Sequence, residues 1–144
     1  MKFFKKILYA LFIYFILLSF SNFAFSSDFD KDWEHFFASK EASDKAVQIS
    51  NQGELFSYTS QDKVDQIIKL KEKALSEAKV VSDIFLEKTH REMLNYYRNY
   101  YQKSLELFIY GMKNHDINAI QEYHILHSGF INWFNTNRSE LRSP

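Results

Sequence analysis

The sequence contains no cysteine, and this absence excludes several kinds of chemistry. Without cysteine the chain has no disulfide bond, no thiolate metal ligand, no cysteine nucleophile and no sulfur to carry a lipid. Its fold must therefore be stabilised by packing and by hydrogen bonds.

Proline and glycine, which interrupt helices and form tight turns, are also scarce. The 144 residues include one proline, the terminal Pro144, and three glycines. This is too few turn residues for a protein built of strands, so we expect long helices. The length fits one domain with one modest core.

Outside the first six residues the sequence has no cluster of basic residues, and the formal charge of the whole chain is zero. A surface that binds a phosphate backbone needs concentrated lysine and arginine. We therefore expect no nucleic-acid partner.

Motifs of covalent, hydrolytic and nucleotide chemistry are missing as well. The sequence has no Gly-x-Ser-x-Gly turn around a serine nucleophile, no His-Glu-x-x-His helix and no glycine-rich phosphate loop. We therefore expect a protein that is not an enzyme and that carries no cofactor.

The first 26 residues have the order of parts found in a secretory signal peptide. Three lysines lie in the first six residues, an apolar run follows over Ile7–Leu18, and residues 19–26 are smaller and more polar. Ala24 and Ser26 place small residues before a cut between Ser26 and Ser27. We expect cleavage there, which leaves 118 residues with 15 basic and 18 acidic side chains, a net charge of −3.

The alternative is that this segment is kept as a membrane anchor. Residues 7–25 reach the roughly 17 to 25 residues of a membrane span if the polar residues among them are tolerated. Both interpretations leave the lysines in the cytoplasm and export the rest of the chain. We expect a secreted or periplasmic protein, or one anchored by residues 7–25 with its C-terminus outside.

Three long helices are predicted after the leader, within a single exported all-α domain at residues 27–144. Apolar residues recur at helical spacing over about residues 30–50, 60–112 and 117–141. The middle of the first helix, around residues 40–45, is polar and is expected to hold the core most weakly.

Residues suited to helix ends flank these segments. Thr59–Asp62 has the sequence of a capping box and predicts the start of the second helix. Asp116 is suited to cap the third helix, and Asn114 is suited to the left-handed conformation in the turn before it.

The short break between the second and third helices predicts an antiparallel hairpin. If the chain turns between Asn114 and His115, residues whose numbers sum to about 229 face each other, which places Gly129 opposite Tyr100. By the same counting the first helix lies along the first half of the second. We expect an elongated protein of three long helices, resembling a coiled coil, or a four-helix bundle if the second helix bends near residues 82–89.

Aromatic residues on both arms of this hairpin form a matching stripe. Its members are Tyr97, Tyr100 and Phe108 on the second helix and Tyr123, Phe130, Trp133 and Phe134 on the third. Packing in the core is the ordinary explanation for such a stripe. In an elongated three-helix protein part of the stripe stays uncovered, which favours self-association or another protein partner.

Histidines at one-turn spacing suggest a metal site. Glu87 and His90 form one such pair, and His124 and His127 form another. In the hairpin the two pairs lie roughly 22 Å apart, so they cannot share one ion. His124 and His127 alone make an incomplete site, and we expect no metal.

The sequence therefore predicts an exported helical protein without catalytic activity that binds a protein, itself or another, through the aromatic stripe. One alternative is a helical carrier of a metal or a small ligand, which uses His124, His127 and the aromatic hairpin. A second alternative is a membrane-tethered protein that keeps residues 7–25 as its anchor and touches the membrane only there.

Overall fold

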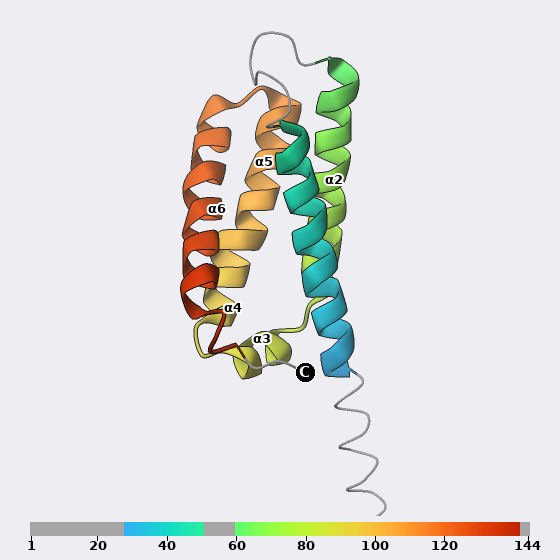
Figure 1. The fold of residues 1–144 in the computed structure, drawn as a ribbon. Coiled ribbons are helices and arrows are strands. Elements are labelled where there is room, and N and C mark those ends of the chain that lie inside the picture. The colour runs from blue at the N-terminus through green and yellow to red at the C-terminus, as the bar shows by residue number, and fades with distance from the viewer. Residues whose placement is uncertain (1–27, 51–59, 142–144) are drawn as a thin grey trace, which may run out of the picture. The chain divides into compact units, whose positions relative to one another are not determined.

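The structure is a computed structural model that describes residues 28–50 and 60–141, and these residues include helices and no strand (Figure 1). The all-α fold class is thus confirmed for them. The chain divides into two units, residues 1–31 and 32–144. The expected leader and its cut between Ser26 and Ser27 lie outside the described residues. No helix in the described part is long and apolar enough to cross a membrane.

Four helical columns of alternating direction make up the described part of the second unit (Figure 1). In chain order they are residues 32–50, α2 (Gln61–Val80), the π-helical η1 (Tyr96–Gln102) continued by α5 (Lys103–Asn114), and α6 (Ile117–Asn137). The second column is joined to the third by two short helices, α3 (Asp83–Thr89) and α4 (Met93–Asn95). Of the two predicted arrangements, the chain thus adopts the helical bundle.

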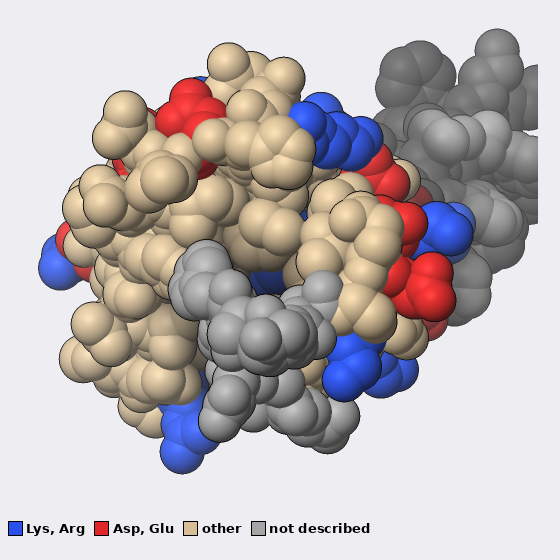
Figure 2. All heavy atoms as spheres, turned by 90° about the horizontal axis from the view of Figure 1, so that it is seen from above, with Lys and Arg blue, Asp and Glu red and all other residues tan. Residues whose placement is uncertain are grey.

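A hollow opens between the helices at the end of the bundle where α2 begins and α5 ends. Figure 2 looks onto this end and shows atoms of a lysine or arginine deep inside the hollow. Such a position is unusual, because long basic side chains normally extend into water.

The predicted second helix is interrupted directly after α2. Ser82 has an extended backbone there (φ −77°, ψ 148°), and its Oγ caps α3 by accepting a hydrogen bond from the Phe85 N–H at 3.2 Å. Asp32 holds Ser82 in place, since its carboxylate accepts from the Ser82 N–H at 2.8 Å and from its hydroxyl at 2.6 Å. The prediction of one continuous helix over residues 60–112 is therefore wrong.

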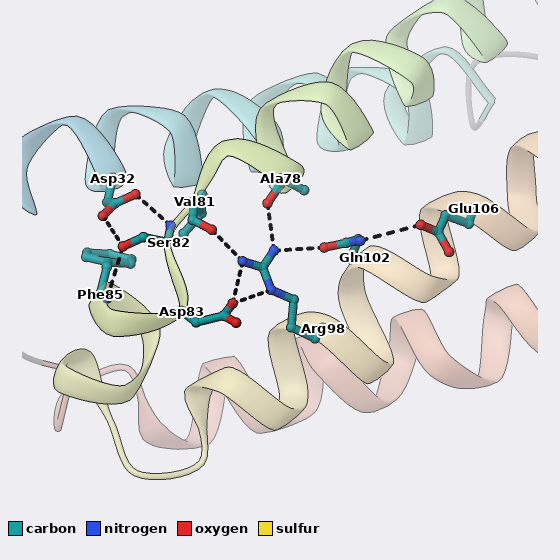
Figure 3. Close-up of polar contacts among 9 residues, drawn as sticks. All are labelled: Asp32, Ala78, Val81, Ser82, Asp83, Phe85, Arg98, Gln102 and Glu106. Atoms are coloured by element: carbon teal, nitrogen blue, oxygen red, sulfur yellow. Dashed lines mark hydrogen bonds and ion pairs between the residues drawn. The ribbon is translucent and has the colours of Figure 1, made fainter. Parts of the chain in front are cut away.

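Arg98 of η1 binds the open end of α2 at this corner (Figure 3). Its guanidinium donates to the carbonyl oxygens of Ala78 and Val81 and to Asp83 Oδ1, the last from Nε at 2.9 Å and from Nη2 at 2.7 Å. It also donates to Gln102 Oε1 at 2.8 Å. The last carbonyls of a helix have no hydrogen-bond donor within the helix, and Arg98 supplies donors to two carbonyls at the end of α2. One side chain thus joins α2, α3 and η1.

The π-helical turn η1 determines which way these side chains point. The Lys103 N–H bonds to the carbonyl of Arg98, five residues earlier, which widens the helix. Tyr97 and Tyr101 both lie in the core, at 0% and 1% exposure, while Arg98 reaches α2.

The hairpin of α5 and α6 has the predicted register. A Cβ added to Gly129 would lie 3.0 Å from Tyr100 Cδ1, so these two residues face each other as expected. The turn differs by one residue, because His115 and not Asn114 takes the left-handed conformation (φ 53°, ψ 36°). Asn114 stays in α5, where its side chain donates to the Tyr110 carbonyl at 2.8 Å.

The predicted caps have mixed outcomes. Asp116 caps α6 as expected, by accepting a hydrogen bond from the Ala119 N–H at 3.1 Å. Ser60 is the residue before α2, and its side chain makes no capping hydrogen bond. The other hydroxyl of the predicted capping box, that of Thr59, lies outside the described residues.

The aromatic stripe packs inside the bundle. Tyr97, Tyr123, Phe130 and Trp133 are buried, and Tyr100, Phe108 and Phe134 are half-buried. The first helix covers them, since the Phe36 ring lies 5.4 Å from that of Tyr97 and 5.7 Å from that of Phe134. The bend after α2 closes the bundle over a stripe that an elongated protein would expose. These seven side chains therefore pack the chain's own helices together, and their role as a surface for a partner stays a prediction.

Candidate ligand site in the bundle core

One lysine lies in the core of the bundle. Lys71 occupies the inward face of α2 between Ile67 and Ala74, and its exposed fraction is 1%. Its Nζ donates to Ser43 Oγ of the first helix at 2.9 Å and to the Tyr123 hydroxyl of α6 at 3.1 Å. Lysine is almost never fully buried unless a charged partner accompanies it.

In the part of the chain that the structure describes, aromatic rings and not carboxylates lie around this ammonium group. Nζ lies 5.3 Å from the ring centre of Phe108 and 5.1 Å from that of Tyr123, within the range in which a ring face attracts a cation. Within the described residues Lys71 forms no ion pair. Burial lowers the pKa of Lys71 to about 8, and the charge of Asp44 opposes this effect.

Hydroxyl groups extend the polar region from Lys71 across the bundle. Ser39 Oγ donates to the Ala74 carbonyl at 2.6 Å, and a serine has one hydroxyl proton. The Tyr101 hydroxyl is therefore the donor in its 2.9 Å contact with Ser39 Oγ. Burial raises the pKa of Tyr101, which keeps that proton in place. The hydrogen bonds of these two hydroxyls thus run from Tyr101 through Ser39 to a backbone carbonyl of α2.

His127 of α6 adjoins the same polar region. Ser104 Oγ donates to the Tyr101 carbonyl at 2.7 Å, so its 3.4 Å contact with His127 Nδ1 has the ring N–H as donor. This assigns the lone pair of the imidazole to Nε2. Burial, followed by the charge of Lys71, lowers the pKa of His127 to about 3, so the ring is neutral at physiological pH.

The two candidate metal ligands on α6 have different surroundings. His124 is exposed, whereas His127 is partly buried and faces the polar core. No three histidine, aspartate or glutamate side chains in the described part of the chain are grouped so that they could hold a metal ion. The positive charge of Lys71 also disfavours a cation beside His127, as it disfavours the protonated ring.

The other predicted pair lies near the short helices α3 and α4. Glu87 is exposed, and the His90 ring packs edge-on against Trp133 with its centre 5.4 Å away. His90 Nε2 lies 3.7 Å from a carboxylate oxygen of Glu140. His90 therefore joins the end of α3 to the residues that follow α6.

The serines and the lysine of the polar core did not emerge from the sequence patterns. The middle of the first helix, expected to hold the core most weakly, supplies Ser39, Ala42 and Ser43, all of them buried. The available signal was spacing, because Lys71 lies four residues after Ile67 and three before Ala74, on one face of a helix.

Lys71 is also the one buried side chain among the lysines and arginines that the structure describes. It lies in the middle of α2.

No family model matches this chain, and no curated protein or solved structure is significantly similar to it. The chemistry of the core is therefore the guide to function. It combines an ammonium group, hydroxyl donors and a neutral imidazole in a place shielded from water. Such groups bind a small polar molecule through charge and hydrogen bonds.

Proposed function

We propose that this chain is an exported, non-enzymatic carrier of a small polar ligand, which binds in the bundle core beside Lys71. The observation that carries the proposal is the buried ammonium group without a carboxylate partner in the described residues. An uncompensated buried charge costs several kcal/mol. A ligand that accepts hydrogen bonds from Nζ would offset this cost, so a bound ligand would explain why a lysine occupies this buried position.

Export is proposed from the order of charged, apolar and small residues in the first 26 positions. The same carrier function applies if residues 7–25 stay in the membrane as an anchor. Binding of a protein through the aromatic stripe has less support than binding of a small ligand, because the stripe packs the core.

Native mass spectrometry of the protein purified from its own host tests this proposal. We expect a bound small molecule in the wild-type protein that is released on denaturation and absent from Lys71→Met. Lys69→Met is the matched control, since Lys69 is an exposed lysine of the same helix and its loss should leave the bound molecule in place. Circular dichroism establishes that both variants are folded.

The proposal is overturned if wild type and Lys71→Met carry the same molecules, or if the wild type remains empty after incubation with a small-molecule extract of the host. The spectrum of the denatured protein also gives the mass of the chain. A mass that corresponds to a start at Ser27 would establish cleavage of the leader.

A further inference from the structure

We infer that the ligand of this core is a small anion with carboxylate-like oxygens, which binds between Lys71 Nζ and the Tyr123 hydroxyl. The inference rests on the proposed carrier function and narrows it to one class of ligand. Three observations support it: the hydrogen-bond donors left over around Nζ, the balance of charge in the core, and the position of the aromatic rings.

The donors around Nζ exceed the acceptors. An ammonium group has three N–H donors, and Ser43 Oγ and the Tyr123 hydroxyl accept two of them. The Tyr123 oxygen accepts from Lys71, so the phenolic proton points elsewhere, and no hydrogen bond from it is formed among the described residues. Two donor protons therefore remain on atoms 3.1 Å apart, a separation that suits the two oxygens of one carboxylate.

The charge of the core is also unbalanced. Among the described residues, the titratable or charged groups that act on this region are Lys40 and Asp44 on the first helix, Tyr101 on η1, and Tyr123, His124 and His127 on α6. Asp44 is the acidic group whose charge reaches Lys71, but its carboxylate already pairs with Lys40 at 2.6 Å. His127 and the tyrosines are neutral near pH 7. An anion would supply the missing half of a buried ion pair.

The rings limit how such a ligand can approach. The face of Phe108 lies near Nζ, and a ring face carries partial negative charge. An anionic oxygen therefore avoids this face and binds on the side that presents hydroxyl groups. A neutral ligand could accept the same two protons but would leave the charge uncompensated, so the core should prefer an anion to its neutral isostere.

An NMR titration of the purified chain near pH 7, in a buffer without carboxylates, tests this inference. Formate and acetate are the probes, and formamide and acetamide are their neutral counterparts. We expect saturable binding of at least one anion, with affinity at least tenfold above that of its amide. Lys71→Met should abolish this binding, Tyr123→Phe should weaken it about tenfold through one lost hydrogen bond, and Lys69→Met should leave it unchanged.

The affinity for the anion should also fall as the pH rises above about 8, because Lys71 then loses its charge. Equal affinities for anion and amide, an affinity that persists in Lys71→Met, or no binding of either anion would overturn the inference. If mass spectrometry still finds a molecule that depends on Lys71, the carrier function stands with a neutral ligand or one of a different class. If it finds none, both proposals fail.

Discussion

Replacing Lys71 with methionine removes the charge from the core while keeping a side chain of similar length. Folding lowers the pKa of Lys71 from its ordinary 10.5 to about 8. Between these two values the unfolded chain binds more protons than the folded chain, so the stability of the wild-type protein increases as the pH rises from about 8 toward 10.5. We expect this increase to be absent from Lys71→Met.

The difference between 10.5 and about 8 corresponds to about 3 kcal/mol at pH 7, since a tenfold change in an equilibrium constant equals about 1.4 kcal/mol. About 2 kcal/mol of this is recovered by the wild type between pH 7 and pH 9.5. Methionine removes the cost of the charge but leaves the Ser43 and Tyr123 hydroxyls without their donor, at about 1 kcal/mol each. The variant should therefore be about 1 kcal/mol more stable at pH 7.

Urea unfolding, monitored by far-ultraviolet circular dichroism, measures the free energy of unfolding of wild type and Lys71→Met at several pH values between about 7 and 9.5. The buffer should contain no carboxylate, so that a bound anion does not mask the effect. Lys69→Met is the control, and its stability should depend on pH as that of the wild type does. If wild type and Lys71→Met give parallel curves, Lys71 has an ordinary pKa in the folded chain and the reasoning is refuted.

Three further predictions concern other parts of the bundle. Arg98→Lys should lower the free energy of unfolding by about 2 kcal/mol in urea, since an ammonium group cannot replace the forked bonds to the end of α2; an unchanged midpoint would contradict this. Gly129→Ala should lower the stability of the folded protein by about 1 kcal/mol, because its Cβ would lie 3.0 Å from Tyr100 Cδ1. In a Tyr100→Ala background the same substitution should raise the stability, and thermal melts can detect this change of sign. Folding lowers the pKa of His127 from 6.5 to about 3, so the neutral ring contributes stability above about pH 6.5 that is lost as the pH falls toward 3, on the order of 5 kcal/mol. In acid titrations the stability of His127→Gln should therefore depend less on pH than that of the wild type, by that amount. Equal curves for the two proteins would exclude the effect.

The sequence predicted the helices and the register of the hairpin because these depend on signals close together in the chain. Few helix breakers, helical spacing of apolar residues and the Asp116 cap are all local. The bend after α2 was left as one of two possibilities because distant groups determine it. Asp32 binds Ser82, 50 residues away, and Arg98 binds the Val81 carbonyl, 17 residues away.

The polar core was missed for a different reason. Large aliphatic residues such as Ile68 and Leu75 indicated a face of the second helix that lies one position away from the buried face of Ile67, Lys71 and Ala74. Alanine contributes little apolar character to a helix face and lysine contributes polar character. A buried face that contains both therefore resembles a solvent-exposed face in the sequence. The ammonium group became recognisable as a candidate site only when Ser43 and Tyr123 lay beside it.

The bond between Asp32 and Ser82 also bears on the order in which the chain folds. Closing its 50-residue loop costs more conformational entropy than forming the α5–α6 hairpin, whose arms are joined by a turn at His115 and Asp116. We therefore expect the hairpin to form early and the first helix to dock late. The corner after α2 is complete only when Asp32 arrives, so we expect the first described helix to be the last of the bundle to reach its place.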